Sequence, residues 1–260
     1  MRISRRVALA LPAAFLAFTL GAANAQGMKV KIGTEGAYPP FNNLTSDGKL
    51  EGFDIDIARA LCEEMKAECE FVTQDWDGII PALQAGKFDA IIASMSINED
   101  RKKEVDFTDK YYNTPPAIVV PKDSDIKGVT KEDLAGKTIG AQGSTTHSTY
   151  AEKTFTDSDV KLYPTSEEYK LDIINGRLDA VIDDVVVLDE FLKTDDGACC
   201  KIAGTLTPIE EIYGPGIGIA VRKGDNDLRE KLNAAIKAIR ENGKYKEIND
   251  KHFSFDVYGD

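Results

Sequence analysis

The feature that most constrains the fold of this chain is a short pattern that occurs twice. Gly-Lys-Phe-Asp-Ala-Ile-Ile at residues 86–92 is echoed by Gly-Arg-Leu-Asp-Ala-Val-Ile at residues 176–182. Each copy follows a helix-like segment, begins with a glycine that can end a helix, and runs into an apolar strand. Strand-like runs at residues 29–33 and 137–139 precede the copies in the same order, and each leads into a glycine-containing turn. Two echoes in register predict two related α/β lobes.

Helix-like segments alternate with short apolar strands along the chain. The helix candidates are residues 55–65, 79–85, 166–174 and 228–240. Such alternation predicts mostly parallel sheets flanked by helices, in which ligands bind beyond the carboxyl ends of the strands. Polar or aromatic residues follow the predicted strands: Glu35, Tyr38, Ser94, Ser96, Ser144, Thr145, Asp183 and Asp184.

The first 25 residues have the pattern of a cleaved secretory signal peptide. Three arginines within residues 2–6 precede an apolar run at 7–20 and the small-residue triplet Ala23-Asn24-Ala25. A run of about 14 apolar residues is too short for a membrane anchor, which needs ~20. We therefore expect cleavage after Ala25 and export, with the twin-arginine route left open as an alternative.

The charge balance excludes one class of partner. The chain has a net charge of −12. The only charged residues of the signal peptide are three arginines, so its loss makes the net charge more negative. Binding to a phosphate backbone depends on neutralising cations, so nucleic acid is not an expected partner. The 42% of hydrophobic residues suffice for one large domain or two small ones.

The four cysteines suggest disulfide chemistry in an exported protein. A bridge between Cys62 and Cys69 requires the helix to end before Cys69, because within one helix the two would lie about 10 Å apart along the axis. Cys199 and Cys200 could form a vicinal bridge or remain two thiols. No histidine lies near either pair in the sequence, so we expect no metal site.

Residues 91–101, Ile-Ile-Ala-Ser-Met-Ser-Ile-Asn-Glu-Asp-Arg, place two serines and a cation after a buried strand. Ser96 and Glu99 fit a capping box, which predicts that a helix begins after Ser96. A helix start offers free N–H groups to an anion, and Arg101 could hold a carboxylate there through two parallel hydrogen bonds. The alternative for Arg101 is a solvated charge on the helix face.

Other candidate residues also have two interpretations. The segment 143–146 could offer N–H groups and a hydroxyl to the same anion or only begin a helix. Asp183 and Asp184 could contact a ligand, pair with a cation or cap a helix. Tyr38 and Trp76 could stack on a flat or cationic group or pack in the core. His147 could serve as a base, although a surface position is the simpler interpretation.

Taken in order, these residues resemble the periplasmic solute-binding proteins of polar amino-acid ABC importers, especially the lysine/arginine/ornithine and histidine binders. The resemblance extends from about Lys29 to Gly259. It is carried by Gly33-Thr34-Glu35, Tyr38-x-Pro40-Phe41, Gly52-Phe53-Asp54-Ile55-Asp56, the Ser-Met-Ser-Ile run reaching Arg101, and Phe107-Thr108-Asp109.

The resemblance implies a two-lobed, type II Venus-flytrap fold, each lobe a mostly parallel sheet flanked by helices. Lobe 1 would comprise residues 26–113 and 210–260, and lobe 2 residues 114–209. Two hinge crossings would lie near residues 112–116 and 207–214. The protein would be a periplasmic monomer without a cofactor that delivers its ligand to an inner-membrane ABC permease, and Cys62 and Cys69 would form a disulfide found in that family.

By the same resemblance, Arg101 would hold the ligand's carboxylate with the Ser96 backbone and Thr145. Ser94, Ser96 and Asp184 would receive the α-amino group, and Tyr38 and Trp76 would sandwich the side chain. Glu35 falls where basic-amino-acid binders carry an aspartate that meets the distal cation. Departures from the family are Glu35, one methylene longer than that aspartate, Ala93 in place of a common serine, the large Trp76, and Asp183 in place of a neutral residue.

The charge count favours a cationic ligand. Arg101 and Asp184 balance the two charges of any amino-acid zwitterion, which would leave Glu35 as an unpaired buried carboxylate at a cost of several kcal/mol. A cationic side chain removes that penalty, which favours arginine, ornithine or lysine. The alternatives are histidine, an arginine-derived opine that the large Trp76 site would suit, an enzyme on the same scaffold, and a sensor that docks on a receptor.

Overall fold

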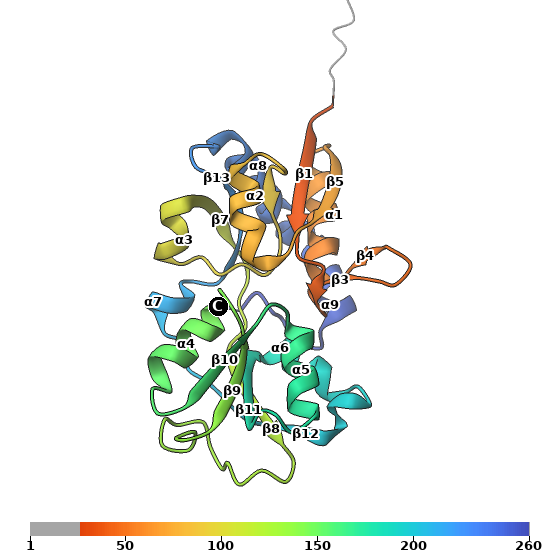
Figure 1. Ribbon diagram of the computed structural model, residues 1–260. Helices are drawn as coiled ribbons and strands as arrows, with labels where there is room; N and C mark the ends of the chain where they lie inside the picture. Colours follow the sequence, from red (N-terminus) through yellow and green to blue (C-terminus); the bar gives the residue numbers. More distant parts are fainter. Residues whose placement is uncertain (1–26, 260) are drawn as a thin grey trace, which may run out of the picture.

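The computed structural model describes residues 27–259, so the predicted signal peptide lies outside the described residues. The chain forms two lobes, each built on a five-stranded sheet (Figure 1). The first sheet has the order β5 (Glu68–Thr73), β1 (Lys29–Thr34), β6 (Ala90–Ile91), β13 (Ile217–Arg222), β7 (Val105–Tyr112). The second has the order β10 (Asp159–Tyr163), β9 (Thr138–Gln142), β11 (Ala180–Asp184), β8 (Pro116–Pro121), β12 (Cys200–Thr205).

Both sheets are mostly parallel, as the sequence predicts. In the first sheet β1 is parallel to β5 and β6, and only β13 runs against its neighbours. In the second sheet β9 is parallel to β10 and β11, and only β8 runs against its neighbours. A small antiparallel sheet of β2 (Ala37–Tyr38), β3 (Asn42–Leu44) and β4 (Leu50–Glu51) extends from the first lobe.

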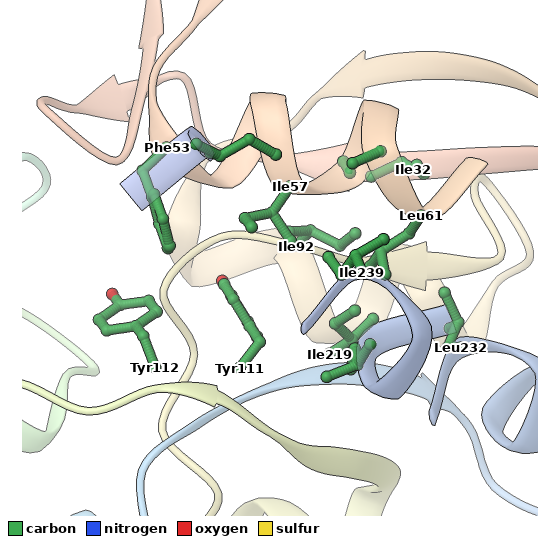
Figure 2. Packing of buried hydrophobic residues seen from close by; sticks show 14 of the residues in the cluster. Ile32, Phe53, Ile57, Leu61, Ile92, Tyr111, Tyr112, Ile219, Leu232 and Ile239 are labelled. Carbon is green, nitrogen blue, oxygen red and sulfur yellow. The ribbon is translucent and has the colours of Figure 1, made fainter. Parts of the chain in front are cut away.

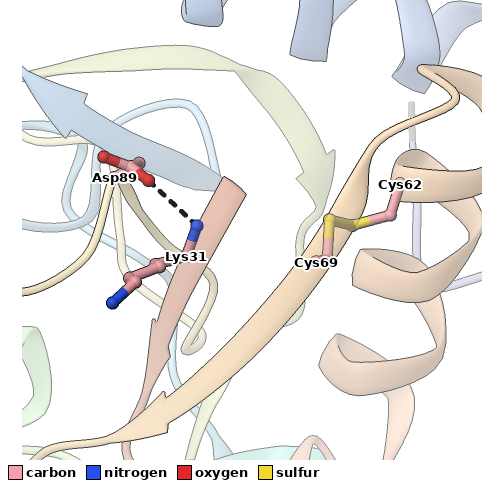
Figure 3. The surroundings of a disulfide bond; sticks show 4 residues. All are labelled: Lys31, Cys62, Cys69 and Asp89. Carbon is pink, nitrogen blue, oxygen red and sulfur yellow. Dashed lines mark hydrogen bonds between the residues drawn. A yellow bond between two sulfur atoms is a disulfide. The ribbon is translucent and has the colours of Figure 1, made fainter. Parts of the chain in front are cut away.

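The repeated Asp-Ala pattern has the same structural role in both lobes. The Asp89 N–H donates to the Lys31 carbonyl at 2.8 Å, and the Asp89 carboxylate accepts the Lys31 N–H at 2.9 Å (Figure 3). Asp179 and Thr138 repeat this pair of bonds at 2.9 and 2.7 Å. Each aspartate therefore fixes the start of one central strand against its neighbour.

The glycines of the two preceding strands also have matching roles. A Cβ atom on Gly33 would lie 2.5 Å from the Phe88 ring, and one on Gly140 would lie 2.5 Å from a Leu178 methyl group. The apolar residue before each Asp-Ala pair thus packs directly on the glycine of the adjacent strand. Only glycine leaves room for this contact.

The helices confirm the sequence predictions to within two residues at each end. Those predicted are α1 (Phe53–Glu64), α2 (Ile79–Gln84), α5 (Ser166–Ile174) and α8 (Asn226–Glu241). The others are α3 (Glu99–Glu104), α4 (Thr146–Thr154), α6 (Val185–Leu192), α7 (Glu210–Tyr213) and α9 (Lys244–His252), with 3-10 turns η1 (Trp76–Gly78) and η2 (Asp196–Cys199). No helix within residues 27–259 has the length and apolar character needed to cross a bilayer.

Each lobe has its own hydrophobic core on both faces of its sheet. In the first lobe, Ile32 and Ile219 of the sheet pack against Ile57 of α1 and Leu232 of α8 (Figure 2). These side chains are at most 2% exposed. Truncating one of them to alanine would cost about 2–5 kcal/mol.

The cysteines differ between the two lobes. Cys62 of α1 and Cys69 of β5 form a disulfide with a Cα–Cα distance of 6.2 Å (Figure 3). Helix α1 ends at Glu64, which confirms the prediction that it stops before Cys69. Cys199 and Cys200 are separate thiols, one exposed and one buried.

The chain passes between the sheets twice. It leaves β7 at Tyr112 and enters β8 at Pro116, then leaves β12 at Thr205 and re-enters the first sheet at β13. Helices α8 and α9 that follow pack against α1, so the last part of the described chain belongs to the first lobe (Figure 1). The lobe boundaries after residues 113 and 209 stay a prediction.

Candidate functional site

Both lobes contribute to one cleft between them. Its walls include all eight predicted contact residues, Glu35, Tyr38, Trp76, Ser94, Ser96, Arg101, Thr145 and Asp184, together with Ala93. Thr146, from the predicted segment 143–146, and His147, considered as a base, also line it. The sequence did not single out the remaining lining residues as contacts: Tyr112, Asn113, Thr114, Gln142, Tyr213, Gly216 and Ile217. Ser144 and Asp183 lie beside the cleft and contact residues of its walls.

The cleft residues sit at strand and helix ends. Glu35 follows β1, and Ser94 follows β6 in a left-handed conformation with φ of +54°. Thr145 caps α4, accepting the Ser148 N–H at 3.0 Å. Asp184 ends β11 and caps α6 by accepting the Val186 N–H at 2.8 Å, so it both caps a helix and faces the cleft.

The predicted capping box at Ser96 is wrong. Helix α3 begins at Glu99, and Asn98 caps it by accepting the Arg101 N–H at 2.9 Å. The residues before it stay extended because the Ile97 N–H donates to the Gly216 carbonyl at 2.9 Å beside β13. The Ser96 hydroxyl is therefore free of the helix and bonds to the Thr146 hydroxyl at 3.2 Å.

Arg101 is held at the cleft as a cation without a paired acid. Its guanidinium donates to the carbonyls of Ser96 and Ser144 at 3.1 and 3.2 Å and lies 5.2 Å from the centre of the Trp76 ring. Within residues 27–259 no carboxylate lies within ion-pair distance of it. Burial lowers the pKa of Arg101 to about 10, which leaves it charged at neutral pH. Backbone carbonyls compensate the charge only in part, which favours an anionic group in the cleft.

Two carboxylates face the same cleft. Burial raises the pKa of Glu35 to about 7, although a hydrogen bond from Gln142 at 2.6 Å opposes that rise. Burial also raises the pKa of Asp184 to about 7, against hydrogen bonds from Thr114 and from the N–H groups of α6. Within residues 27–259 neither acid forms an ion pair, so burial dominates the shift of both pKa values.

Polar contacts join the lobes across the cleft. Trp76 Nε1 donates to the Ser144 carbonyl at 3.1 Å, and the Tyr38 hydroxyl donates to Asp183. The pair formed by Glu35 and Gln142 also crosses between lobes. The structure is therefore a closed arrangement of the two lobes.

The surface position predicted for His147 is wrong. Its side chain is only 13% exposed and lies at the start of α4, with Nε2 3.3 Å from Asp183 and Nδ1 3.1 Å from the Tyr213 hydroxyl. Burial lowers its pKa, although the nearby Asp183 opposes that shift. The sequence signal was the neighbouring predicted helix start, which places residue 147 at the cleft.

One missed residue could have been found from the repeat. Aligning the turn after β1 with the turn after β9 places Gln142 opposite Glu35, and the two side chains bond to each other. Residues from the hinge region, such as Thr114 and Tyr213, carry no comparable signal. Within residues 27–259 no group of three or more metal-ligating side chains could hold a metal ion.

Comparison with known proteins extends over nearly the whole chain. Residues 30–255 match the bacterial extracellular solute-binding proteins, family 3. The chain is 50% identical over 233 residues to the L-arginine-binding protein of Pseudomonas aeruginosa, covering 88% of this chain and 90% of that protein. It is 40% identical to the histidine-binding periplasmic protein of Escherichia coli, covering 88% and 89%. A solved structure of an ancestral arginine-binding protein bound to arginine has a TM-score of 0.80 at 40% identity, covering 87% and 98%.

Proposed function

Because this chain belongs to family 3 of the bacterial extracellular solute-binding proteins, we propose that its cleft captures a basic L-amino acid by closure of the two lobes. Arginine, ornithine and lysine are the expected ligands, with histidine a weaker candidate. The chain is a binding protein rather than an enzyme, as are the relatives to which it is similar. We further propose that it works as a periplasmic monomer and delivers its ligand to an inner-membrane ABC permease.

The charge inventory of the cleft is the observation that carries this proposal. The cleft offers one unpaired cation, Arg101, and two carboxylates, Glu35 and Asp184. A ligand with one carboxylate and two cationic groups complements this set. A neutral amino acid would leave one buried carboxylate unpaired, which costs several kcal/mol.

The roles follow from the positions of the charges. Arg101 and the start of α4 would hold the α-carboxylate, since both present N–H donors to the cleft. Asp184 and Ser94 would receive the α-ammonium group. The side chain would pass between the rings of Tyr38 and Trp76 to reach Glu35. A planar guanidinium gains most from such flanking rings, which favours arginine among the three expected ligands.

Isothermal titration calorimetry on mature protein, refolded to remove carried-over ligand, tests the proposal. Arginine, ornithine, lysine, histidine, glutamine and an opine would be compared. We expect Kd values of about 1 μM or tighter, near −8 kcal/mol, for the cationic amino acids. Glutamine should bind at least about tenfold more weakly, because it leaves Glu35 unpaired.

The variant Glu35→Gln is the matched control, because it keeps the side-chain length and removes the charge. It should bind arginine more weakly than the wild-type protein does, and the ratio of the Kd values for glutamine and arginine should be smaller. Equal binding of glutamine and arginine by the wild-type protein would contradict the role of Glu35. Binding of the opine alone would replace the proposed ligand with a larger one.

A further inference from the structure

Asp54, in the Gly-Phe-Asp-Ile-Asp motif, is a charged residue that the cleft itself does not explain. It is fully buried at the start of α1 and does not line the cleft. Three side chains bond to its carboxylate. Tyr111 Oη donates to Oδ1 at 2.7 Å, and both Asn42 Nδ2 and Ser94 Oγ donate to Oδ2 at 2.9 Å. Of these partners, Ser94 is the one that also lines the cleft.

The direction of these hydrogen bonds is fixed by the surrounding groups. Asn42 Oδ1 accepts the Gly36 N–H at 2.8 Å, so the amide nitrogen of Asn42 must face Asp54. An ionised carboxylate can only accept, so the Ser94 hydroxyl has to donate its single proton to Asp54. Burial raises the pKa of Asp54, and the hydrogen bonds from Tyr111, Asn42 and Ser94 oppose that rise.

We propose that Asp54 is a positioning residue for ligand selection, which fixes the Ser94 hydroxyl as an acceptor toward the cleft. With its proton committed to Asp54, Ser94 presents only lone pairs to the ligand. Such a group accepts from an α-ammonium and cannot donate to a hydroxyl or carbonyl oxygen in its place.

The same hydrogen-bond network also reaches the turn after β1, which carries Glu35. Asn42 bridges Asp54 to the backbone of Gly36, directly after Glu35. Asp54 thus connects the turn after β1 with the turn after β6, two turns whose side chains would meet opposite ends of the ligand. The inference rests on the proposed function in one respect, namely that Ser94 receives the α-ammonium group.

The variant Asp54→Leu tests the inference, because leucine approximates the shape of aspartate but offers no acceptor, which frees the Ser94 proton to turn toward the cleft. Calorimetry would compare arginine with 5-guanidinopentanoate, which lacks the α-amino group. We expect the wild-type protein to prefer arginine by about 100-fold or more. In Asp54→Leu this ratio should shrink at least about tenfold, chiefly through weaker binding of arginine.

Asp56→Leu is the matched control on the same helix. Asp56 pairs with Lys251 and His252 away from the cleft, so this variant should leave the ratio unchanged. Equal loss of both ligands in Asp54→Leu, or an unchanged ratio, would show a purely structural role and overturn the inference. If the wild-type protein bound no arginine, the proposed function would fail and the inference with it.

Neutron diffraction on the wild-type protein provides a reading that does not depend on folding of the variant. The Ser94 deuteron is expected on the line from Oγ to Asp54 Oδ2. A deuteron directed into the cleft would overturn the inference even if the protein binds arginine as proposed.

Discussion

At the scale of single residues, Glu35 destabilises the ligand-free protein, whereas its proposed role is to select a cationic ligand. In the ligand-free protein its pKa is raised from 4.5 to about 7, so the folded state holds the proton more tightly than the unfolded chain. Ionisation of Glu35 therefore opposes folding, increasingly so as the pH rises from about 4.5 to 7 and fully above that range. A residue suited to a cationic ligand is thus unfavourable while the cleft is empty.

Glu35→Gln should accordingly stabilise the ligand-free protein at pH 8 by about 1–3 kcal/mol, a range reduced because the side chain is only partly buried. At pH 4, where Glu35 is protonated in both states, the gain should nearly vanish. Urea denaturation at both pH values measures the difference. The control Glu68→Gln, at an exposed ion pair with Lys29, should change stability little at either pH. A loss of stability in Glu35→Gln at pH 8 would show that Glu35 is better solvated than the structure indicates.

The internal repeat explains how much of the cleft the sequence could predict. When the two copies of the repeat are aligned, Asp184 occupies the position equivalent to Ser94. Aligning the turns that precede the copies makes Gln142 equivalent to Glu35. All four line the cleft, because each lies at or just after the carboxyl end of a parallel strand of its sheet. Tyr213 reaches the cleft from the predicted hinge region, and no local pattern in the sequence records its place there.

At the scale of elements, a polar pattern predicted a helix start in the wrong place. Ser96 and Glu99 have the spacing of a capping box, but Asn98 is an equally good cap and lies closer to the helix. The choice between them depends on β13, more than a hundred residues later, whose neighbour Gly216 holds Ile97 in an extended conformation. The local signal correctly predicted a capped helix start in this segment, but a tertiary contact determines which residue is the cap.

The glycines that face the repeated motif give a prediction at this scale. Gly33→Ala should destabilise the protein by about 1–3 kcal/mol, because the new methyl group would overlap the Phe88 ring. Adding Phe88→Ala should recover part of the overlap cost, so the double variant should be more stable than the sum of the two single effects. Denaturation midpoints of the four proteins in this cycle measure the coupling.

Gly143→Ala is the control for that cycle, since its methyl group would come no closer than 3.7 Å to any neighbour. It should change stability by only a few tenths of a kcal/mol. Additive effects of Gly33→Ala and Phe88→Ala would mean that the strand moves to accept the methyl group, and that the repeat does not depend on this contact.

At the scale of the whole molecule, one hydrogen bond between the lobes involves Asp183, which is not among the residues proposed to bind the charged groups of the ligand. The Tyr38 hydroxyl in lobe 1 donates to Asp183 in lobe 2, and Asp183 also accepts from Tyr169 and lies near His147. Asp183 is 1% exposed, so opening of the lobes would remove one of its donors while leaving the others. This bond therefore favours the closed state whether or not a ligand is present.

Tyr38→Phe should weaken closure and keep the ring that would flank the ligand. A ligand shifts the lobes only by its different affinity for the open and closed states, so a less stable closed state lowers apparent affinity without changing ligand preference. Loss of one hydrogen bond to a charged group corresponds to about 1.5–3 kcal/mol, or roughly 10-fold to 100-fold in Kd. Small-angle scattering should show a larger radius of gyration for the ligand-free variant, and arginine should restore the wild-type value. A change in the ratio of arginine to lysine affinity would instead place the Tyr38 hydroxyl in the selection of the side chain, because a bond that acts only on closure affects every ligand equally.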